Sequence, residues 1–197
     1  WKNTKAKAEP RQTDNGMDEI ALHVLDIIQN SVRAGARCIQ VRFERQGHML
    51  RITISDDGCG MSEETAAKAC SPFSTSRTTR KVGLGLPLLM ASAQGCGGSF
   101  GIKSQPGKGT VVEAVFNTQN IDCPPVGDIN GTMLSQFVCH PEIDFIYTFS
   151  NERGSMRTDT KEIKSVLDGV PLDTPEVVEW MRSGLAKEFE ALGEKEY

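Results

Sequence analysis

The segment DIIQNSVRAGA, residues 26–36, decides how the whole chain is interpreted. It lies in an apolar periodicity that begins near Met17 and predicts a helix with one buried face, ended by Gly35. Asp26 and Asn30 are four residues apart, so both project from one side of that helix. An amide oxygen can bind Mg²⁺ and a carboxylate can orient or deprotonate a water, although two polar residues on a solvated face would give the same pattern.

A second polar segment, ISDDGCGM at 54–61, follows a predicted strand. Alternating apolar residues predict strands at 39–43 and 50–54, joined by a turn at 46–48. A carboxylate at a strand end can accept a hydrogen bond from an exocyclic amino group, and the glycines let a flat ring approach the backbone. An ordinary Asp-Gly turn is the alternative.

Two further glycine motifs follow, KVGLGL at 81–86 and GKGT at 107–110. The first opens a predicted helix from Leu84 to Gln94, and amides at a glycine-rich helix N-terminus can bind phosphate. Its glycine spacing fits neither the P-loop nor the dinucleotide fingerprint. The second lies between predicted strands at 99–104 and 110–117, where a plain hairpin turn would also account for it.

The remaining elements complete a fold-class prediction. Ser62 is a predicted N-cap for a short helix through Cys70, and 71–82 is a polar loop. Helices and antiparallel strands together favour an α/β (α+β) two-layer sandwich. Residues 1–16 lack apolar periodicity and are expected to form a flexible tail.

The chain changes character after Asn117. Cys123-Pro124-Pro125 is typical of a linker, and we expect a small α+β extension over 120–197 after a domain at 17–119. The extension is predicted to hold a helix from Asp128 to Val138, a strand at 143–149, a turn at 151–154, a helix ending at Leu167 and a last helix opened by Thr174-Pro175.

The four motifs, taken in order, resemble those of the gyrase, chaperone, histidine kinase and mismatch-repair (GHKL) ATPases. Residues 26–30 match the N-box, and the three glycine boxes match at 56–60, 83–86 and 107–110. PFSTS at 72–76 resembles the start of the ATP lid. The resemblance covers about a hundred residues and implies a Bergerat-type ATP-binding fold, with a mixed sheet and helices on one face, that binds ATP and Mg²⁺.

The resemblance also implies roles for single residues. Asn30 would be the Mg²⁺ ligand and Asp56 would bind the adenine amino group, with Thr110 assisting through water. Gly58 and Gly60 would give room beside the nucleotide, whereas Gly83, Gly85 and Leu86 would lie along the phosphates. Ser76, Arg77, Arg80 and Lys81 belong to the lid, where the cations could meet the triphosphate or remain solvated loop charges.

Asp26 departs from the family pattern, because hydrolysing members carry Glu there as general base. Aspartate is one methylene shorter, so we expect slow hydrolysis. The lid entry and the GLGL box are similar to those of histidine kinases, yet only 25 residues precede the N-box, too few for a phospho-accepting helical hairpin. We therefore expect a stand-alone kinase-like regulator acting on a partner protein. An ATP-operated switch with slow ATPase activity and a non-catalytic nucleotide sensor are the alternatives.

Composition restricts the other function classes. Lysine and arginine number 22 against 26 acidic residues, a net charge of −4 that argues against general nucleic-acid binding. No apolar run is long enough to span a bilayer, and the start of the chain has no secretory signal. The six cysteines include no Cys-x-x-Cys pair, which favours a reduced cytoplasmic protein. His23 is expected to be packed or solvated rather than catalytic.

Overall fold

A single mixed sheet organises the computed structural model, which describes residues 19–70 and 85–194. Its six strands lie in the order β3-β4-β2-β1-β5-β6, and all neighbours are antiparallel except β1 and β5. The strands are β1 (Cys38–Gln46), β2 (Met49–Asp56), β3 (Ser99–Gln105), β4 (Gly109–Asn117), β5 (Asp144–Asn151) and β6 (Gly154–Asp159). The helices are α1 (Ile20–Arg33), α2 (Glu63–Ala69), α3 (Gly85–Gly95), α4 (Ile129–Cys139), α5 (Thr160–Leu167) and α6 (Pro175–Ala191).

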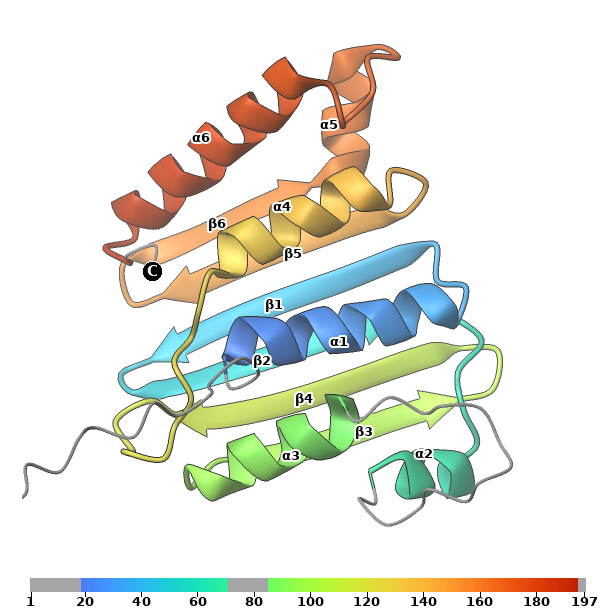
Figure 1. The fold of residues 1–197 in the computed structure, drawn as a ribbon, viewed down its shortest axis with the longest axis vertical. Coiled ribbons are helices and arrows are strands. Elements are labelled where there is room, and N and C mark those ends of the chain that lie inside the picture. The colour runs from blue at the N-terminus through green and yellow to red at the C-terminus, as the bar shows by residue number, and fades with distance from the viewer. Residues whose placement is uncertain (1–18, 71–84, 195–197) are drawn as a thin grey trace, which may run out of the picture.

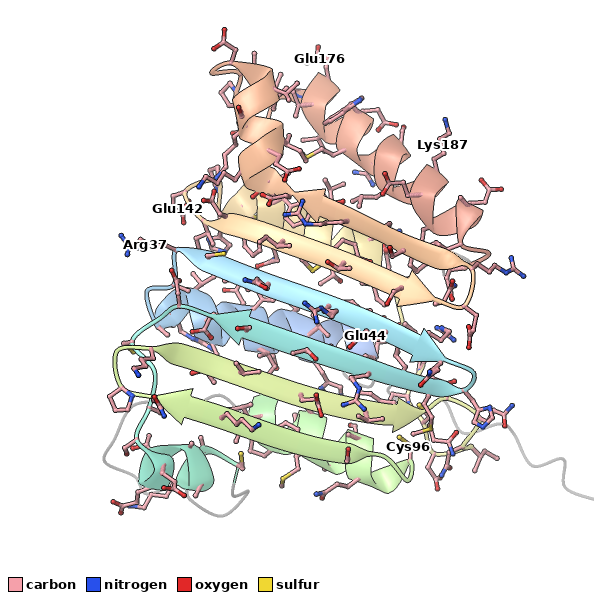
Figure 2. All side chains as sticks on the ribbon, turned by 180° about the vertical axis from the view of Figure 1, so that it is seen from behind. Arg37, Glu44, Cys96, Glu142, Glu176 and Lys187 are labelled. Atoms are coloured by element: carbon pink, nitrogen blue, oxygen red, sulfur yellow. The ribbon has the colours of Figure 1, made fainter. Side chains whose placement is uncertain are left out.

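Helices α1, α3 and α4 lie side by side over one face of the sheet (Figure 1). Seen from behind, the strands face the viewer with no described helix over them (Figure 2). The predicted two-layer α+β fold, with a mixed sheet and helices on one face, is therefore confirmed.

The alternation of side chains along the strands produces this one-sided architecture. Val41 pairs with Ile54 and with Tyr147, and all three side chains are buried beneath the helices. Directly paired residues point to the same face, so their neighbours form the opposite, open face. There Arg51 and Glu113 make an ion pair at 2.7 Å with both side chains nearly half exposed, a surface contact that contributes little to stability.

The start of α1 is completed by a segment far away in the sequence. Its N-cap residue, Glu19, makes no side-chain cap hydrogen bond. Instead the main-chain N–H groups of Ile20 and Ala21 donate to the carbonyl oxygens of Pro125 and Val126 at 2.9 and 3.0 Å. Since the first N–H groups of a helix have no partner within it, the chain after β4 supplies what α1 lacks.

The segment after Asn117 joins the same sheet and the same core. Strand β5 pairs in parallel with β1, and Phe43 of β1 lies 6.0 Å from Tyr147 of β5 between ring centroids. Phe149 of β5 contacts Phe189 of α6 at 4.8 Å. The predicted helices and the strand of this segment are present, with Asp128 as the N-cap of α4. Strand β6 was not predicted, because Met156 is its only buried residue.

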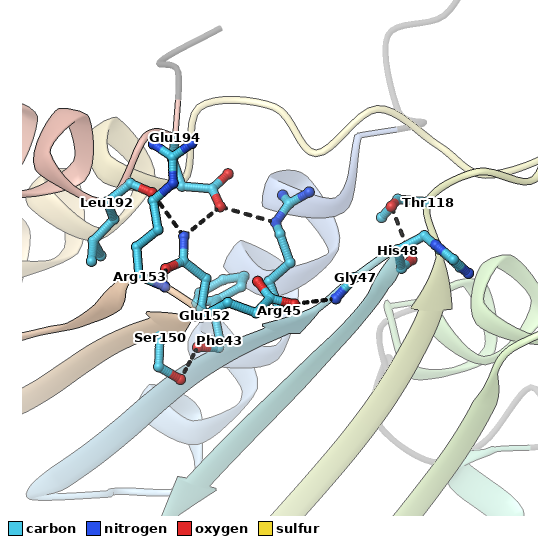
Figure 3. A network of polar contacts seen from close by, with 11 residues as sticks. Phe43, Arg45, Gly47, His48, Thr118, Ser150, Glu152, Arg153, Leu192 and Glu194 are labelled. Atoms are coloured by element: carbon cyan, nitrogen blue, oxygen red, sulfur yellow. Dashed lines mark hydrogen bonds and ion pairs between the residues drawn. The ribbon is translucent and has the colours of Figure 1, made fainter.

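A polar network fastens the end of α6 to the sheet (Figure 3). Arg45 Nε lies 3.2 Å from Glu194 Oε1, and Asn151 Nδ2 donates to Leu192 O at 2.9 Å. The helix ends in a Schellman motif, in which Glu194 N donates to Phe189 O and Gly193 adopts a φ of 70°. The last helix is thus held at both the aromatic core and its C-terminus.

None of the helices within 19–70 and 85–194 is both long and apolar enough to cross a membrane. The predicted N-terminal tail at 1–16 lies outside the described residues.

Candidate functional site

The carboxylate of Asp56 is oriented by two hydrogen bonds on the helix-covered face of the sheet. Asp56 is the last residue of β2 and pairs with Ile39 on one side and Thr110 on the other. Ser31 Oγ of α1 donates to Asp56 Oδ2 at 2.7 Å, and Gly58 N donates to Asp56 Oδ1 at 2.9 Å. Each oxygen retains a further lone pair, so the carboxylate can still accept a hydrogen bond from a ligand.

A cavity of about 240 Å³ opens beside this carboxylate, between α1, α3 and the ends of β2 and β4. Its apolar walls come from Ile27, Ala34, Met61, Ala69, Leu86 and Val112. Its polar lining comes from Asn30, Ser31, Arg33, Asp56, Cys59, Gly60 and Thr110. Pockets that enclose a whole drug-sized ligand measure roughly 300–1,000 Å³, so this one fits a single flat ring system.

The neighbouring carboxylate, Asp57, serves the fold. Its Oδ1 accepts hydrogen bonds from Arg37 N at 2.7 Å and Cys38 N at 2.9 Å, which ties the start of β1 to the end of β2. The bond from the Cys38 main chain, reinforced by that from Arg37, holds the pKa of Asp57 below its ordinary value. Two adjacent aspartates therefore have different tasks, and only Asp56 faces the cavity.

The first and third glycine boxes pack directly on one another. Gly60 has a φ of 63°, and a Cβ there would lie 1.9 Å from the carbonyl oxygen of Gln105. Gly109 has a φ of 86°, and its Cβ would lie 1.8 Å from the carbonyl oxygen of Asp56. Gly107 N donates to Cys59 O at 2.7 Å across the same contact. Glycine is required at both positions by the chain's own backbone, which fixes the loop after Asp56.

A group of hydroxyls lies beside Asp56 at the start of β4. Thr110 Oγ1 and Ser104 Oγ are 2.9 Å apart, and Ser104 Oγ also accepts a hydrogen bond from Met61 N at 2.8 Å. This places the Thr110 hydroxyl at the cavity in a fixed orientation, next to the strand position that carries the carboxylate.

Asn30 and Asp26 lie along the side of α1 that approaches the start of α3. The Asn30 amide oxygen accepts a hydrogen bond from Arg33 Nη2 at 2.5 Å, at the rim of the cavity. Asp26 is exposed and lies outside the cavity lining. Gly85, the first residue of α3, lies against it, because a Cβ on Gly85 would come within 2.8 Å of Asp26 Cβ.

The structure brings to one cavity five of the eight predicted site residues that it describes. Asn30, Asp56, Gly60, Leu86 and Thr110 line one cavity. Gly58 is bonded to Asp56, and a Cβ on it would meet Ala34 at 2.9 Å, so the chain itself occupies that space. The predicted lid residues Ser76, Arg77, Arg80 and Lys81, together with Gly83, lie outside the described residues.

Sequence reasoning missed two residues that support this site. Ser31 belongs to the buried side of α1, and its hydroxyl orients Asp56. The available signal was a serine at the helical spacing of an apolar stripe, and the structure shows this residue to be only 3% exposed. Ser104 carried no signal, since its role depends on the pairing of β3 with β4. His23 is packed, one of the two states expected for it, and its ring nitrogen Nε2 lies 3.2 Å from Ser92 Oγ of α3.

Comparison with known proteins shows which sequences and which fold this chain resembles. Alignments of 109 and 110 residues relate the chain to two bacterial proteins. It is 31% identical over 109 residues to the cell-division control histidine kinase PdhS of Brucella abortus (strain S19), covering 47% of this chain and 10% of that protein. It is 27% identical over 110 residues to the non-motile and phage-resistance protein of Caulobacter vibrioides, covering 50% and 13%. The chain thus spans about a tenth of the length of these relatives.

A solved structure shares the fold. The N-terminal domain of a DNA repair protein superposes with a TM-score of 0.51 at 14% identity, covering 72% of this chain and 51% of that one. At this identity the likeness concerns the fold alone. Residues 17–120 match the sequence model of the histidine kinase-, DNA gyrase B- and HSP90-like ATPases, more than half of the chain. The chain belongs to this family of ATPase domains.

Proposed function

We propose that this protein binds ATP with Mg²⁺ and acts as a kinase-like regulator on a partner protein. The observation that carries the proposal is the Asp56 carboxylate, held by Ser31 and Gly58 beside a cavity with largely apolar walls. An acceptor in this position pairs with the exocyclic amino group of adenine. Guanine presents a carbonyl oxygen there, and two facing acceptors would leave the carboxylate unpaired at a cost of about 1–3 kcal/mol.

The residues around the cavity fit the rest of the nucleotide. Thr110, fixed by Ser104, would assist at the base. Leu86, expected along the phosphates, lines the same cavity as Asp56 and would instead cover the base. The first N–H groups of α3, which starts at Gly85, would face the phosphates, where a helix N-terminus favours negative charge. Gly58 and Gly60 would border the nucleotide through their main chain. Ser76, Arg77, Lys81 and Gly83 are proposed for the phosphate side on sequence grounds.

Asn30 is the residue proposed to hold Mg²⁺. Its amide oxygen is a hard ligand of the kind that Mg²⁺ accepts, and it lies at the rim of the cavity beside the start of α3. The cation would neutralise phosphate charge. Binding would require the Asn30 oxygen to exchange its hydrogen bond from Arg33, which frees the guanidinium for a phosphate oxygen.

Asp26 is the proposed catalytic carboxylate. It lies one helical turn before Asn30 and in contact with the first residue of α3, so it is on the phosphate side of the proposed site. It would orient the attacking group, a side chain of a partner protein in the kinase hypothesis or a water in the alternative. That alternative is an ATP-operated switch with slow hydrolysis, favoured by the exposure of Asp26 to solvent.

The experiment that tests the proposal follows the γ-phosphate of labelled ATP incubated with the purified protein and Mg²⁺. Tight binding of ATP without release of phosphate supports a kinase-like regulator that requires its acceptor protein. A non-catalytic sensor would differ, because it would transfer no phosphate even when the acceptor is supplied. Steady release of phosphate, lost in Asp26→Ala, would establish the ATPase switch instead. Absence of any ATP binding would contradict the whole proposal.

A further inference from the structure

The outer edge of β6 offers unpaired main-chain groups. β6 is the last strand of the sheet, and a two-residue loop joins it to β5, with Asn151 opposite Gly154. Such a closing pair is hydrogen-bonded. The alternation then directs the main-chain N–H and C=O groups of Met156 and Thr158 toward β5, and those of Ser155 and Arg157 away from the sheet. Phe145 N, which donates to Thr160 Oγ1 at 2.8 Å, continues the same alternation. Among the described residues, the outward N–H groups of Ser155 and Arg157 donate to no other element.

A hollow runs between this strand edge and the last two helices. It measures about 210 Å³ and lies in the angle that β6, α5 and α6 form in Figure 1. Strand β6 contributes Arg157, Thr158 and Asp159, α5 contributes Glu162 and Ile163, and α6 contributes Trp180, Met181, Gly184, Leu185 and Glu188. Trp180 is 58% exposed although it lines the hollow. An edge strand faced by a helix with apolar side chains between them is the arrangement that accepts an added strand.

Gly184 keeps the helix side of the hollow open. It lies in the middle of α6, where glycine costs about 0.5–1 kcal/mol relative to alanine. A Cβ on Gly184 would meet nothing within 4 Å, so packing within the chain does not require glycine at this position. The glycine leaves room at the place where a ligand backbone would lie between α6 and β6.

The charges that line the hollow favour a positively charged ligand. Asp159, Glu162 and Glu188 line it together with a single cation, Arg157. Arg157 is already paired with Asp159 at 2.6 Å and with Glu162 at 2.9 Å, so the lining has an excess of negative charge. A second copy of the chain would bring the same excess, which disfavours pairing of β6 with itself. We propose that an extended, lysine- or arginine-rich segment of a partner protein adds to the free edge of β6 and inserts an apolar side chain between β6 and α6.

This interaction is independent of the nucleotide, so its test needs no ATP. The probe is a nine-residue peptide of alternating valine and lysine. A peptide of alternating valine and glutamate is the control for charge, and the lysine peptide N-methylated at alternate residues is the control for main-chain hydrogen bonds. The protein is the full chain carrying Trp1→Phe, which leaves Trp180 as the only tryptophan. We expect a saturable blue shift of Trp180 emission with the lysine peptide alone, together with slower amide hydrogen exchange in β6.

Matched variants separate docking from folding. Ser155→Pro removes one outward N–H and leaves the bonds to β5, so the affinity should fall about fivefold, the equivalent of one hydrogen bond. Gly184→Leu fills the hollow and should abolish binding while the thermal midpoint is maintained. Ser183→Leu, which introduces the same side chain at the neighbouring exposed position, should bind as the parent does. Glu188→Lys should weaken the binding of the lysine peptide.

Three results would overturn the inference. Equal binding of the lysine and glutamate peptides would remove the charge argument, and unchanged binding by Gly184→Leu would place the peptide elsewhere. Protection of the Ser155 and Arg157 amides in the free protein would mean that the edge is already occupied. If that protection rose with protein concentration, the occupant would be a second copy of the chain.

Discussion

The first residue of α3, Gly85, packs directly on the side chain of Asp26 in α1. A Cβ placed on Gly85 would lie 2.8 Å from Asp26 Cβ and 3.2 Å from Asp26 Oδ2, closer than side chains normally approach. The second glycine box therefore has a steric task within the chain, because it lets the start of one helix reach the carboxylate of another. Through this contact, the position of Asp26 depends on the position of α3.

Replacing Gly85 by alanine should separate these two helices. We expect Gly85→Ala to lower the free energy of unfolding by about 1–3 kcal/mol, the usual cost of overpacking, and to weaken ATP binding. Gly95→Ala at the other end of α3 is the control, because a Cβ there meets nothing within 4 Å. Urea unfolding of both variants checks this, and equal stabilities would show that the Gly85 contact relaxes without cost.

The hydrogen bond from Ser31 to Asp56 predicts an effect on affinity. In Ser31→Ala the carboxylate loses the donor at 2.7 Å that orients it. We expect ATP affinity, measured by calorimetry, to fall about tenfold or more, because a hydrogen bond to a charged group contributes about 1.5–3 kcal/mol. Ser183→Ala on the exposed face of α6 should leave affinity unchanged. An unaltered affinity in Ser31→Ala would mean that Asp56 is oriented by Gly58 alone.

The segment after Gln119 is predicted to be essential for folding. It supplies the carbonyl groups of Pro125 and Val126 that accept hydrogen bonds from the start of α1. It also supplies β5, the parallel neighbour of β1, and Gln136, whose Oε1 accepts a hydrogen bond from Gln29 Nε2 at 2.7 Å. A fragment ending at Gln119 should show no cooperative thermal transition, because β1 would become an exposed apolar edge. A fragment that unfolds cooperatively, at the midpoint of the full chain, would establish the segment as a separate extension.

Asp57 predicts a dependence of stability on pH. Its pKa lies below the ordinary value because the Cys38 and Arg37 N–H groups donate to the charged carboxylate. A lowered folded-state pKa contributes stability above the unfolded pKa of about 3.9, and this stability is lost as pH falls through the folded-state value. The stability difference between the parent and Asp57→Asn should therefore be largest near neutral pH and shrink below pH ~4. Thermal midpoints recorded across this range test it, and a constant difference would exclude the charge as its origin.

The parts of the fold that the sequence predicted are those with local signals. The stripe of α1, the alternation of β1 and β2, the Ser62 cap of α2 and the proline that opens α6 are all visible in short segments. β6 was missed because an edge strand with one buried residue has almost no apolar alternation. The union of β5 with β1 was missed because parallel pairing joins residues about a hundred positions apart and leaves no local mark.

In the candidate site, too, the residues with local sequence signals were predicted and the contacts between distant segments were not. Asp56, Asn30 and Thr110 were identified from the order of the motifs, and they line one cavity. The packing of Gly60 on Gln105 and of Gly109 on Asp56 depends on how two hairpins meet, which no single motif encodes. The glycines were expected to make room for a ligand, whereas the space a Cβ would need at Gly58 and Gly60 is taken by the chain itself.

The most direct test of the central claim is the affinity of Mg²⁺-ATP for the parent protein, Asp56→Ala and Asp57→Ala, measured by calorimetry at neutral pH. The account predicts that the parent binds ATP, that Asp56→Ala loses binding while it stays folded, and that Asp57→Ala retains the affinity of the parent in whatever fraction remains folded. Normal ATP affinity in Asp56→Ala would contradict the assignment of the adenine site.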